Sequence, residues 1–502
     1  MKNDQISRRR FIKKTTVAAA GISLFPHINC GKIGVAKPMR RGLGRIGFDV
    51  TTLGLGGQAS IQWTPEDVDP VKIILKAFTL GLNYFDTSNL YGSSQSHYGK
   101  AFHQLDLIPG RPGYDEKKRR SIFITSKTHL RWAKGPRKIE GVNLWTNGPD
   151  GSLTIDDLKR TLSQIFGDGK GNYPPGAYVD MVLMHSVSSM ADVNVLFTGL
   201  ENPDPKDESI GALAALLDYR DGTNRTGLNP QEERLVRHLG FSGHHSPAVM
   251  MEMIQRDTGD ILDGMLVSIN PNDRLFFNMQ QNVIPVARAK NMGIIGMKIF
   301  ADGAMYTKGS HWSYLPEHVV RSTGSPDLPS RPLVEYGLST PGIATAIIGI
   351  GQISNDPLQC QLTQNLSAAQ IKPESLNSTE RKNIEQATAR IKEGKTNYFQ
   401  LPAEPLSPPR DPEWEQNMAD GKRAVHLSWH TAFAADEPIQ RYDIIRDQEK
   451  IGSVLHKPQV NKDPFVFTDH PSDVATHKYR IVTVDASEQE ASTDEFQIPA
   501  AI

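Results

Sequence analysis

The sequence predicts a (β/α)₈ TIM barrel followed by a small all-β, immunoglobulin-like sandwich, and two observations support this fold class. From Leu43 onward, short apolar runs of β type alternate with longer segments of helical period, as repeated βα units on a parallel sheet require. After residue 400 the helical period gives way to alternation of apolar and polar residues, which indicates strands with one buried face. The 502 residues are enough for two or three folded units.

Eight short apolar runs qualify as barrel strands. They are Thr52–Gly56, Leu82–Phe85, Ile122–Ser126, Asp180–His185, Leu239–Ser242, Met265–Asn270, Ile294–Phe300 and Ala346–Gly351. Helices are predicted between them, among others at Pro70–Leu80, Ile155–Phe166, Pro247–Ile254 and Met279–Met292. Eight parallel strands with intervening helices favour a closed barrel. A doubly wound open sheet is the alternative, but no G-x-G-x-x-G follows the first run.

The composition limits the kinds of partner. Lys+Arg and Asp+Glu both number 56, so the formal net charge is zero and the chain lacks the basic excess of a nucleic-acid-binding protein. The two cysteines, Cys30 and Cys360, offer no disulfide framework. We therefore expect a small-molecule partner, no nucleic acid and no metal site.

Residues 1–33 are interpreted as a targeting segment. Ser7-Arg8-Arg9-Arg10-Phe11-Ile12-Lys13 precedes an apolar run from Thr15 to Phe25, which is too short for a stable membrane span. The segment resembles a twin-arginine signal. That resemblance implies contact with the twin-arginine export machinery and a periplasmic or secreted location; a disordered basic tail is the alternative. Cleavage of the signal and lipidation of Cys30 both stay open.

The C-terminal part is predicted to be a separate module. The barrel domain is placed at residues 40–400, a proline-rich linker at 401–411 and the β module at 412–502. Strand alternation runs through Val425, Leu427 and Trp429, with Trp429 expected in the core. With Tyr479 as a tyrosine corner, this module resembles a fibronectin type III domain.

Four polar residues stand at the ends of consecutive predicted strands. Asp86 ends the second run, Tyr91 follows it, and Lys127 and His185 end the third and fourth. Groups at the carboxyl ends of barrel strands share one face, so these side chains should meet. Reduction of a carbonyl needs an acid beside a hydride donor, and a lysine near a tyrosine lowers the pKa of the phenol. Taken singly, each residue could be structural; together, in this order, they predict an acid/base site.

This pattern resembles the aldo-keto reductase superfamily, as a divergent branch, over most of residues 41–365. The family's D-x-x-x-x-Y-G segment stands here as Asp86-Thr87-Ser88-Asn89-Leu90-Tyr91-Gly92. The resemblance implies an oxidoreductase that transfers hydride between a nicotinamide and a carbonyl or alcohol. Tyr91 would be the general acid/base, Lys127 its activator, Asp86 the partner of Lys127, and His185 the group that orients the substrate oxygen.

The resemblance also implies a set of cofactor-binding residues. They are Gly57, Gln58, Ser242, Asn270, Lys298, Phe300, Gly303, Gly349, Gly351, Gln352 and Asn365. The family often has Ser-Asn after strand five and an aromatic residue after strand six, whereas Gly243 and Asn270 stand at these places. No Arg or Lys occurs from Gly349 to Asn365 to meet a 2′-phosphate, so NADP(H) and NAD(H) both stay open. An exported enzyme would have to hold its cofactor tightly.

Four tryptophans indicate a substrate larger than a simple aldehyde. Trp63, Trp132, Trp145 and Trp312 lie in the long segments after strands one, three and seven, where they could stack on a sugar ring or pack the loops onto the barrel. The alternative function is a catalytically lapsed, secreted binding or adhesion protein built on the same barrel.

Overall fold

The structure is a computed structural model that describes residues 36–136, 138–142 and 144–501. The segment interpreted as a twin-arginine signal, with Cys30, lies outside the described residues. Within the described ranges, no helix is long and apolar enough to cross a membrane.

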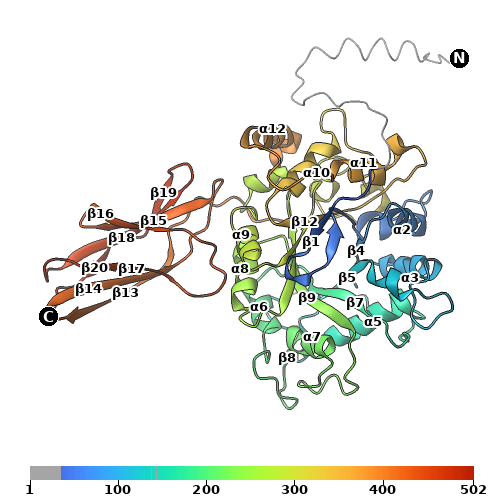
Figure 1. Cartoon of the computed structure of the whole chain (residues 1–502), viewed down its shortest axis with the longest axis horizontal. Helices are drawn as coiled ribbons and strands as arrows, with labels where there is room; N and C mark the ends of the chain where they lie inside the picture. Colours follow the sequence, from blue (N-terminus) through green and yellow to red (C-terminus); the bar gives the residue numbers. More distant parts are fainter. Residues whose placement is uncertain (1–35, 137, 143, 502) are drawn as a thin grey trace, which may run out of the picture. The chain divides into compact units, whose positions relative to one another are not determined.

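Eight parallel strands close into a barrel, as the sequence predicted (Figure 1). Around the barrel the order is β10-β11-β12-β3-β4-β5-β7-β9. In chain order the strands are β3 (Leu53–Leu55), β4 (Tyr84–Asp86), β5 (Phe123–Thr128), β7 (Val179–Met184), β9 (Val236–Gly243), β10 (Leu262–Ser268), β11 (Gly293–Met297) and β12 (Ile343–Ile348). Each contains part of one predicted apolar run, because fully buried parallel strands are apolar on both faces.

Helices surround the barrel (Figure 1). They are α2 (Pro70–Thr79), α3 (Ser94–Gln104), α4 (Glu116–Arg120), α5 (Thr154–Phe166), α6 (Met190–Leu196), α7 (Ala212–Asp221), α8 (Pro247–Arg256), α9 (Val283–Ala289), α10 (Ser330–Ser339), α11 (Gln361–Ala368) and α12 (Ser378–Ala389). Two short antiparallel pairs complete this part: β1 (Arg40–Gly42) with β2 (Asp49–Thr51), and β6 (Trp132–Lys134) with β8 (Ile210–Gly211).

Several predicted elements are longer than the observed ones, and two of these differ by more than a residue or two at one end. The strand predicted to reach Phe300 ends at Met297, because Lys298 has a left-handed backbone with φ of 60°. The helix predicted from Met279 begins only at Val283, since the Met279 N–H donates to the Asp273 carboxylate instead of entering a helix. The first difference bears on the site, because the early end of β11 directs Lys298 and the residues after it onto the carboxyl face of the barrel.

The interior of the barrel is filled by apolar side chains from several strands on both sides. Tyr84, Phe123, Met181, Leu183, Leu266 and Ile295 form one such cluster, and each is at most 2% exposed. The rings of Tyr84 and Phe123 stack with their centroids 5.7 Å apart. This packing closes the barrel below the carboxyl ends of its strands, so the barrel is a support for the site and not a channel.

The C-terminal strands form a two-sheet sandwich. One sheet has the order β13-β14-β17 and the other β16-β15-β18-β19, with β20 on β18. Their bounds are β13 (Arg410–Ala419), β14 (Lys422–His430), β15 (Ile439–Arg446), β16 (Glu449–Leu455), β17 (Phe465–Asp469), β18 (His477–Asp485), β19 (Glu490–Ser492) and β20 (Phe496–Ile498). Trp429 is fully buried in the core, as predicted, and Tyr479 donates its hydroxyl to Asp469 at 2.6 Å.

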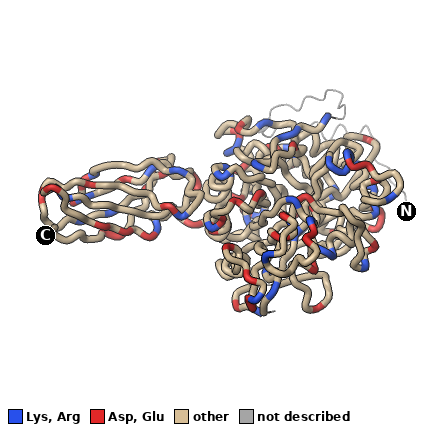
Figure 2. Tube along the Cα trace, turned by 60° about the horizontal axis from the view of Figure 1, so that its bottom comes forward, with Lys and Arg blue, Asp and Glu red and all other residues tan. Residues whose placement is uncertain are grey.

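Acidic and basic residues are interspersed over both the barrel and the sandwich (Figure 2). No stretch of one sign dominates the trace, which agrees with the zero formal charge of the sequence.

Candidate active site

Asp86, Tyr91, Lys127 and His185 meet at the carboxyl face of the barrel, as their places at strand ends predicted. The Lys127 ammonium donates to Asp86 Oδ2 at 2.7 Å and to the Thr87 carbonyl at 2.9 Å. The Tyr91 hydroxyl lies 3.4 Å from His185 Nε2. All four line one cavity of about 530 Å³, a volume typical of small-molecule sites.

Lys127 and Asp86 form a buried ion pair behind the tyrosine ring. Burial raises the pKa of Asp86 and lowers the pKa of Lys127, and their mutual contact works against both shifts. The ammonium lies 4.6 Å from the centroid of the Tyr91 ring, over its face. Lys127 therefore places positive charge against the ring, while its hydrogen bonds go to Asp86 and to the backbone.

The expected lowering of the tyrosine pKa is not what the structure gives. Burial raises the pKa of Tyr91, and the carboxylates of Asp86 and Asp302 raise it further. The physical reason is that the charge of Lys127 is largely compensated by Asp86 at 2.7 Å, so burial dominates. Tyr91 is consequently a protonated phenol at neutral pH, the form that donates a proton.

His185 is held as a neutral imidazole. Burial, followed by the charge of Lys127, lowers its pKa well below the usual range. Its Nδ1 lies 3.1 Å from the Ser88 hydroxyl, and its ring meets the Tyr91 ring edge to face with centroids 5.5 Å apart. A neutral ring fixed in this way can hydrogen-bond a substrate oxygen beside the phenol without adding charge.

The residues predicted to bind the cofactor divide into two groups. Those that line the cavity are Gln58, Ser242, Lys298, Phe300, Gly303 and Gly349. Those outside its lining are Gly57, Asn270, Gly351, Gln352 and Asn365.

Two members of the second group have structural tasks. A Cβ on Gly57 would lie 2.0 Å from the Asp86 carbonyl oxygen, so this position needs glycine to let the ends of β3 and β4 approach. The buried Asn270 side chain donates to the Lys298 carbonyl and to Asn397, each at 3.0 Å, which ties the end of β11 to the chain after α12.

Two backbone N–H groups after β12 already form hydrogen bonds within the protein. The N–H groups of Gly351 and Gln352 donate to the Gln361 side-chain oxygen at 2.7 and 2.8 Å. The nitrogen of the same side chain donates to the carbonyls of Val320 and Ser322. The cavity fits a nicotinamide beside Tyr91, but phosphates could use these two N–H groups only after Gln361 moves.

Several cavity residues were not predicted as site residues. Asp302 accepts bonds from Lys298 and Lys308 at 3.0 and 3.1 Å and from Tyr398 at 2.9 Å. Burial works to raise the pKa of Asp302, but the two ammoniums outweigh it and lower that pKa. Asp302 thus fixes the segment between β11 and α10 to the chain after α12; a left-handed φ of 57° at a non-glycine residue marks the strained turn.

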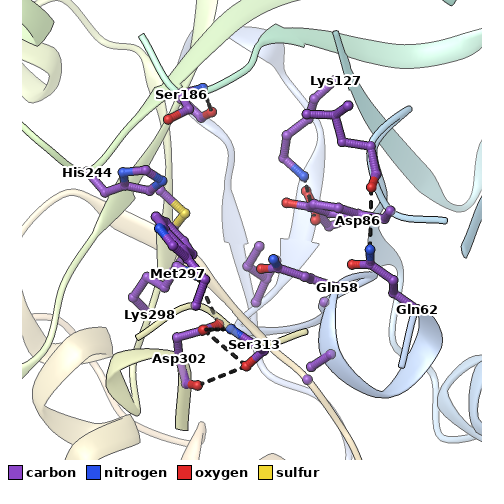
Figure 3. A pocket seen from close by; sticks show the side chains of 18 of the residues that line it. Gln58, Gln62, Asp86, Lys127, Ser186, His244, Met297, Lys298, Asp302 and Ser313 are labelled. Atoms are coloured by element: carbon purple, nitrogen blue, oxygen red, sulfur yellow. Dashed lines mark hydrogen bonds and ion pairs between the residues drawn. The ribbon is translucent and has the colours of Figure 1, made fainter. Parts of the chain in front are cut away.

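Three of the four tryptophans from the sequence lie at the cavity. Trp63, Trp145 and Trp312 line it, whereas Trp132 is buried in β6. Figure 3 shows the cavity between His244, Lys298 and Asp302 on one side and Lys127, Asp86 and Gln62 on the other.

Comparison with known proteins identifies the family. The model of the aldo/keto reductase family matches residues 52–321, more than half of the chain. An uncharacterized oxidoreductase of Bacillus subtilis is 22% identical over 349 residues, covering 66% of this chain and 90% of that protein. A Schizosaccharomyces pombe protein, provisionally named as a voltage-gated potassium channel subunit beta, is 32% identical over 155 residues, covering 26% of this chain and 43% of that protein.

Among solved structures, one from Pseudomonas aeruginosa, provisionally identified as an aldo-keto reductase, covers 66% of this chain and 96% of that chain at 23% identity and a TM-score of 0.39. The family match spans seven of the eight barrel strands and the four strand-end residues of the site. The chain belongs to the aldo/keto reductase family.

Proposed function

We propose that this oxidoreductase is exported and transfers hydride between a nicotinamide cofactor and a carbonyl or alcohol substrate, with Tyr91 as general acid/base. The observation that supports it most is the Tyr91 hydroxyl 3.4 Å from His185 Nε2, with the Lys127–Asp86 pair behind the ring. The family generally uses NAD(P)H, whose nicotinamide supplies the hydride when bound.

The substrate oxygen takes a place between the Tyr91 hydroxyl and His185 Nε2. When Ser88 donates to Nδ1 of the imidazole, the ring proton lies on Nε2 and hydrogen-bonds that oxygen. Tyr91 gives its proton as negative charge develops on the oxygen, and the Lys127 ammonium 4.6 Å from the ring centroid stabilises the phenolate that forms. Cavity walls of Trp, Phe and Ile side chains keep water from competing for the proton.

Gln58, Ser242, Lys298, Phe300, Gly303 and Gly349 are the residues in position to hold the cofactor. Lys298 brings an ammonium, and Gly303, at φ of 87°, brings a turn that only glycine adopts without strain. An exported enzyme has no large pool of reduced nicotinamide to draw on, so we propose that the cofactor stays bound and is reset in place. The β-sandwich, which we propose is fibronectin type III-like, would serve tethering or carbohydrate contact.

Fluorescence titration with NADH and NADPH tests the proposal, using the full chain. We expect binding of at least one nucleotide, and nicotinamide in the denatured extract of protein purified from a periplasmic fraction. Retention through dilution to micromolar protein requires a dissociation constant below about 1 μM. Cytoplasmic protein that is active only with freely exchanging cofactor would contradict export and retention.

A binding or adhesion protein that has lost catalysis is the second candidate. One observation favours it: the N–H groups of Gly351 and Gln352 are already satisfied by Gln361. If neither nucleotide binds and the denatured protein releases no nicotinamide, this candidate replaces the first.

A further inference from the structure

Two aromatic walls stand at the mouth of the cavity. Trp145, which is 62% exposed, stacks on the His129 ring with centroids 5.5 Å apart and an interplanar angle of 16°. Trp312, which is 44% exposed, lies with its ring centroid 5.2 Å from that of His244. Each wall is thus an exposed indole backed by a buried imidazole, and all four rings line the same cavity.

The walls rise from opposite sides of the barrel. Trp145 follows β5 and β6, and Trp312 follows β11. Around the closed barrel, β5 and β11 are separated by three strands in either direction. Loops from opposite strands face each other across the mouth, so the two indoles can contact the two faces of one flat ligand.

Each charged side chain in the cavity lining has a partner of opposite charge, although Asp302 is shared by two ammoniums, because Lys308 outside the lining also donates to it at 3.1 Å. The four charged side chains of the lining form two ion pairs, Lys127 with Asp86 at 2.7 Å and Lys298 with Asp302 at 3.0 Å. Burial keeps His244 neutral at physiological pH, since it lowers the pKa of this imidazole to about 3. An anionic substrate would find no unpaired ammonium in the lining to offset its desolvation.

Polar atoms at the cavity remain without protein partners. Nδ1 of His244, Oε1 of Gln62 and Nε1 of Trp63 are buried and have no hydrogen-bond partner among the described residues. His244 is only 8% exposed and projects toward the cavity in Figure 3. A buried polar atom without a partner is costly, so a ligand that brings several hydroxyls would be stabilised at this place.

We propose that the substrate is an uncharged pyranose that reacts as a closed ring, with its faces against Trp145 and Trp312 and its hydroxyls on His244, Gln62 and Trp63. A pyranose combines apolar C–H faces with polar edges, whereas an aromatic ketone lacks the edge hydroxyls and an open-chain aldehyde lacks the faces. This substrate class rests on the proposed function. In the reducing direction, hydride adds to a ring carbonyl carbon and the Tyr91 proton to its oxygen, which gives a ring alcohol with every ring bond intact.

Calorimetric titration of the full chain with methyl glycopyranosides, which cannot open, tests the binding. Turnover is measured separately, of the glycosides with NAD(P)⁺ and of the carbonyl probes with NAD(P)H. Matched probes are glyceraldehyde, acetophenone and a methyl glucuronoside. We expect a neutral glycoside to bind best, and Trp145→Leu and Trp312→Leu each to weaken it about tenfold. Trp414→Leu, at an indole 37% exposed in β13 of the sandwich, is the control and should change nothing.

Five outcomes separate the possibilities. Tighter binding of acetophenone or glyceraldehyde than of every glycoside, or unchanged glycoside binding in both tryptophan variants, would overturn the proposal. Tighter binding of the glucuronoside than of the neutral glycosides would contradict the proposal that the substrate is uncharged. If the tryptophan variants weaken glycoside binding but no hydride is transferred with either nucleotide, the proposed function is wrong and the pyranose site is supported. If hydride is transferred to acetophenone but no glycoside binds, the proposed function is supported and the pyranose site is wrong.

Discussion

Replacing Tyr91 by phenylalanine removes one hydroxyl from the site and leaves its packing in place. The ring is 9% exposed, meets His185 edge to face and lies under the Lys127 ammonium, and these contacts do not need the oxygen. The lost contact, 3.4 Å to His185 Nε2, is long for a hydrogen bond, so stability should fall by less than about 1 kcal/mol. A positioned general acid contributes about 10²–10⁴-fold, which corresponds to roughly 3–5 kcal/mol of transition-state stabilisation.

The assay therefore compares turnover, nucleotide binding and melting temperature in one series. We expect Tyr91→Phe to lose at least about 100-fold in kcat while nucleotide affinity and Tm stay near those of the parent. Tyr219→Phe is the matched control, because Tyr219 is buried in α7 and outside the cavity. A Tyr91→Phe variant with more than half of the parental kcat would refute the assigned role.

Three further predictions concern pH and packing. Because the pKa of Tyr91 is raised and that of His185 is lowered, kcat/KM for reduction should be flat between about pH 6 and 9, and a limb near pH 6.5 would show that an imidazole titrates. Burial raises the pKa of Asp273 to about 7, so the folded state binds the extra proton between the unfolded pKa near ~4 and about 7. Denaturant stability should fall as pH rises through this window, and Asp273→Asn should reduce the slope; the part that remains is expected from Asp157, whose pKa burial raises to about 6. Gly57→Ala should destabilise by more than about 2 kcal/mol in urea, whereas Gly42→Ala, with its nearest neighbour at 3.9 Å, should be close to neutral.

The four strand-end residues could be predicted because their placement depends on local pattern alone. Asp86 and Lys127 each lie at the end of an apolar run, and parallel strands in a barrel bring such ends to one face. The succession of predicted strands and helices also predicted the barrel, because each βα unit places its strand beside the preceding one. Neither inference needs knowledge of a contact between distant segments.

The rest of the site depends on such contacts. Tyr398 reaches Asp302 from 96 positions further along the chain, and nothing in the local sequence of either residue indicates the pair. Trp132 and Trp145 lie in the same long segment, yet the antiparallel pairing of β6 with β8 buries the first and leaves the second at the cavity mouth. The pKa of Tyr91 was expected to fall because sequence shows that a lysine is near but not how completely the chain surrounds the ring.

The raised pKa of Tyr91 bears on how an exported enzyme could work without a supply of reduced nicotinamide. The resting phenol is prepared for the reducing half of a cycle, since burial and the carboxylates of Asp86 and Asp302 all oppose its ionisation. Under the proposed function, loss of the proton leaves a phenolate while loss of hydride would leave a positive charge on the nicotinamide, and the Lys127 ammonium lies 4.6 Å from the centroid of the Tyr91 ring. The same burial that disfavoured the phenolate now makes it a strong base. Under the proposed function, the phenolate would take the hydroxyl proton of a second substrate, so that oxidation of an alcohol restores the phenol as the cofactor is reset. The proton would then pass from one substrate to the other through Tyr91, and the hydride would pass through the bound nicotinamide. Such a cycle requires no proton from solution and no exchange of cofactor.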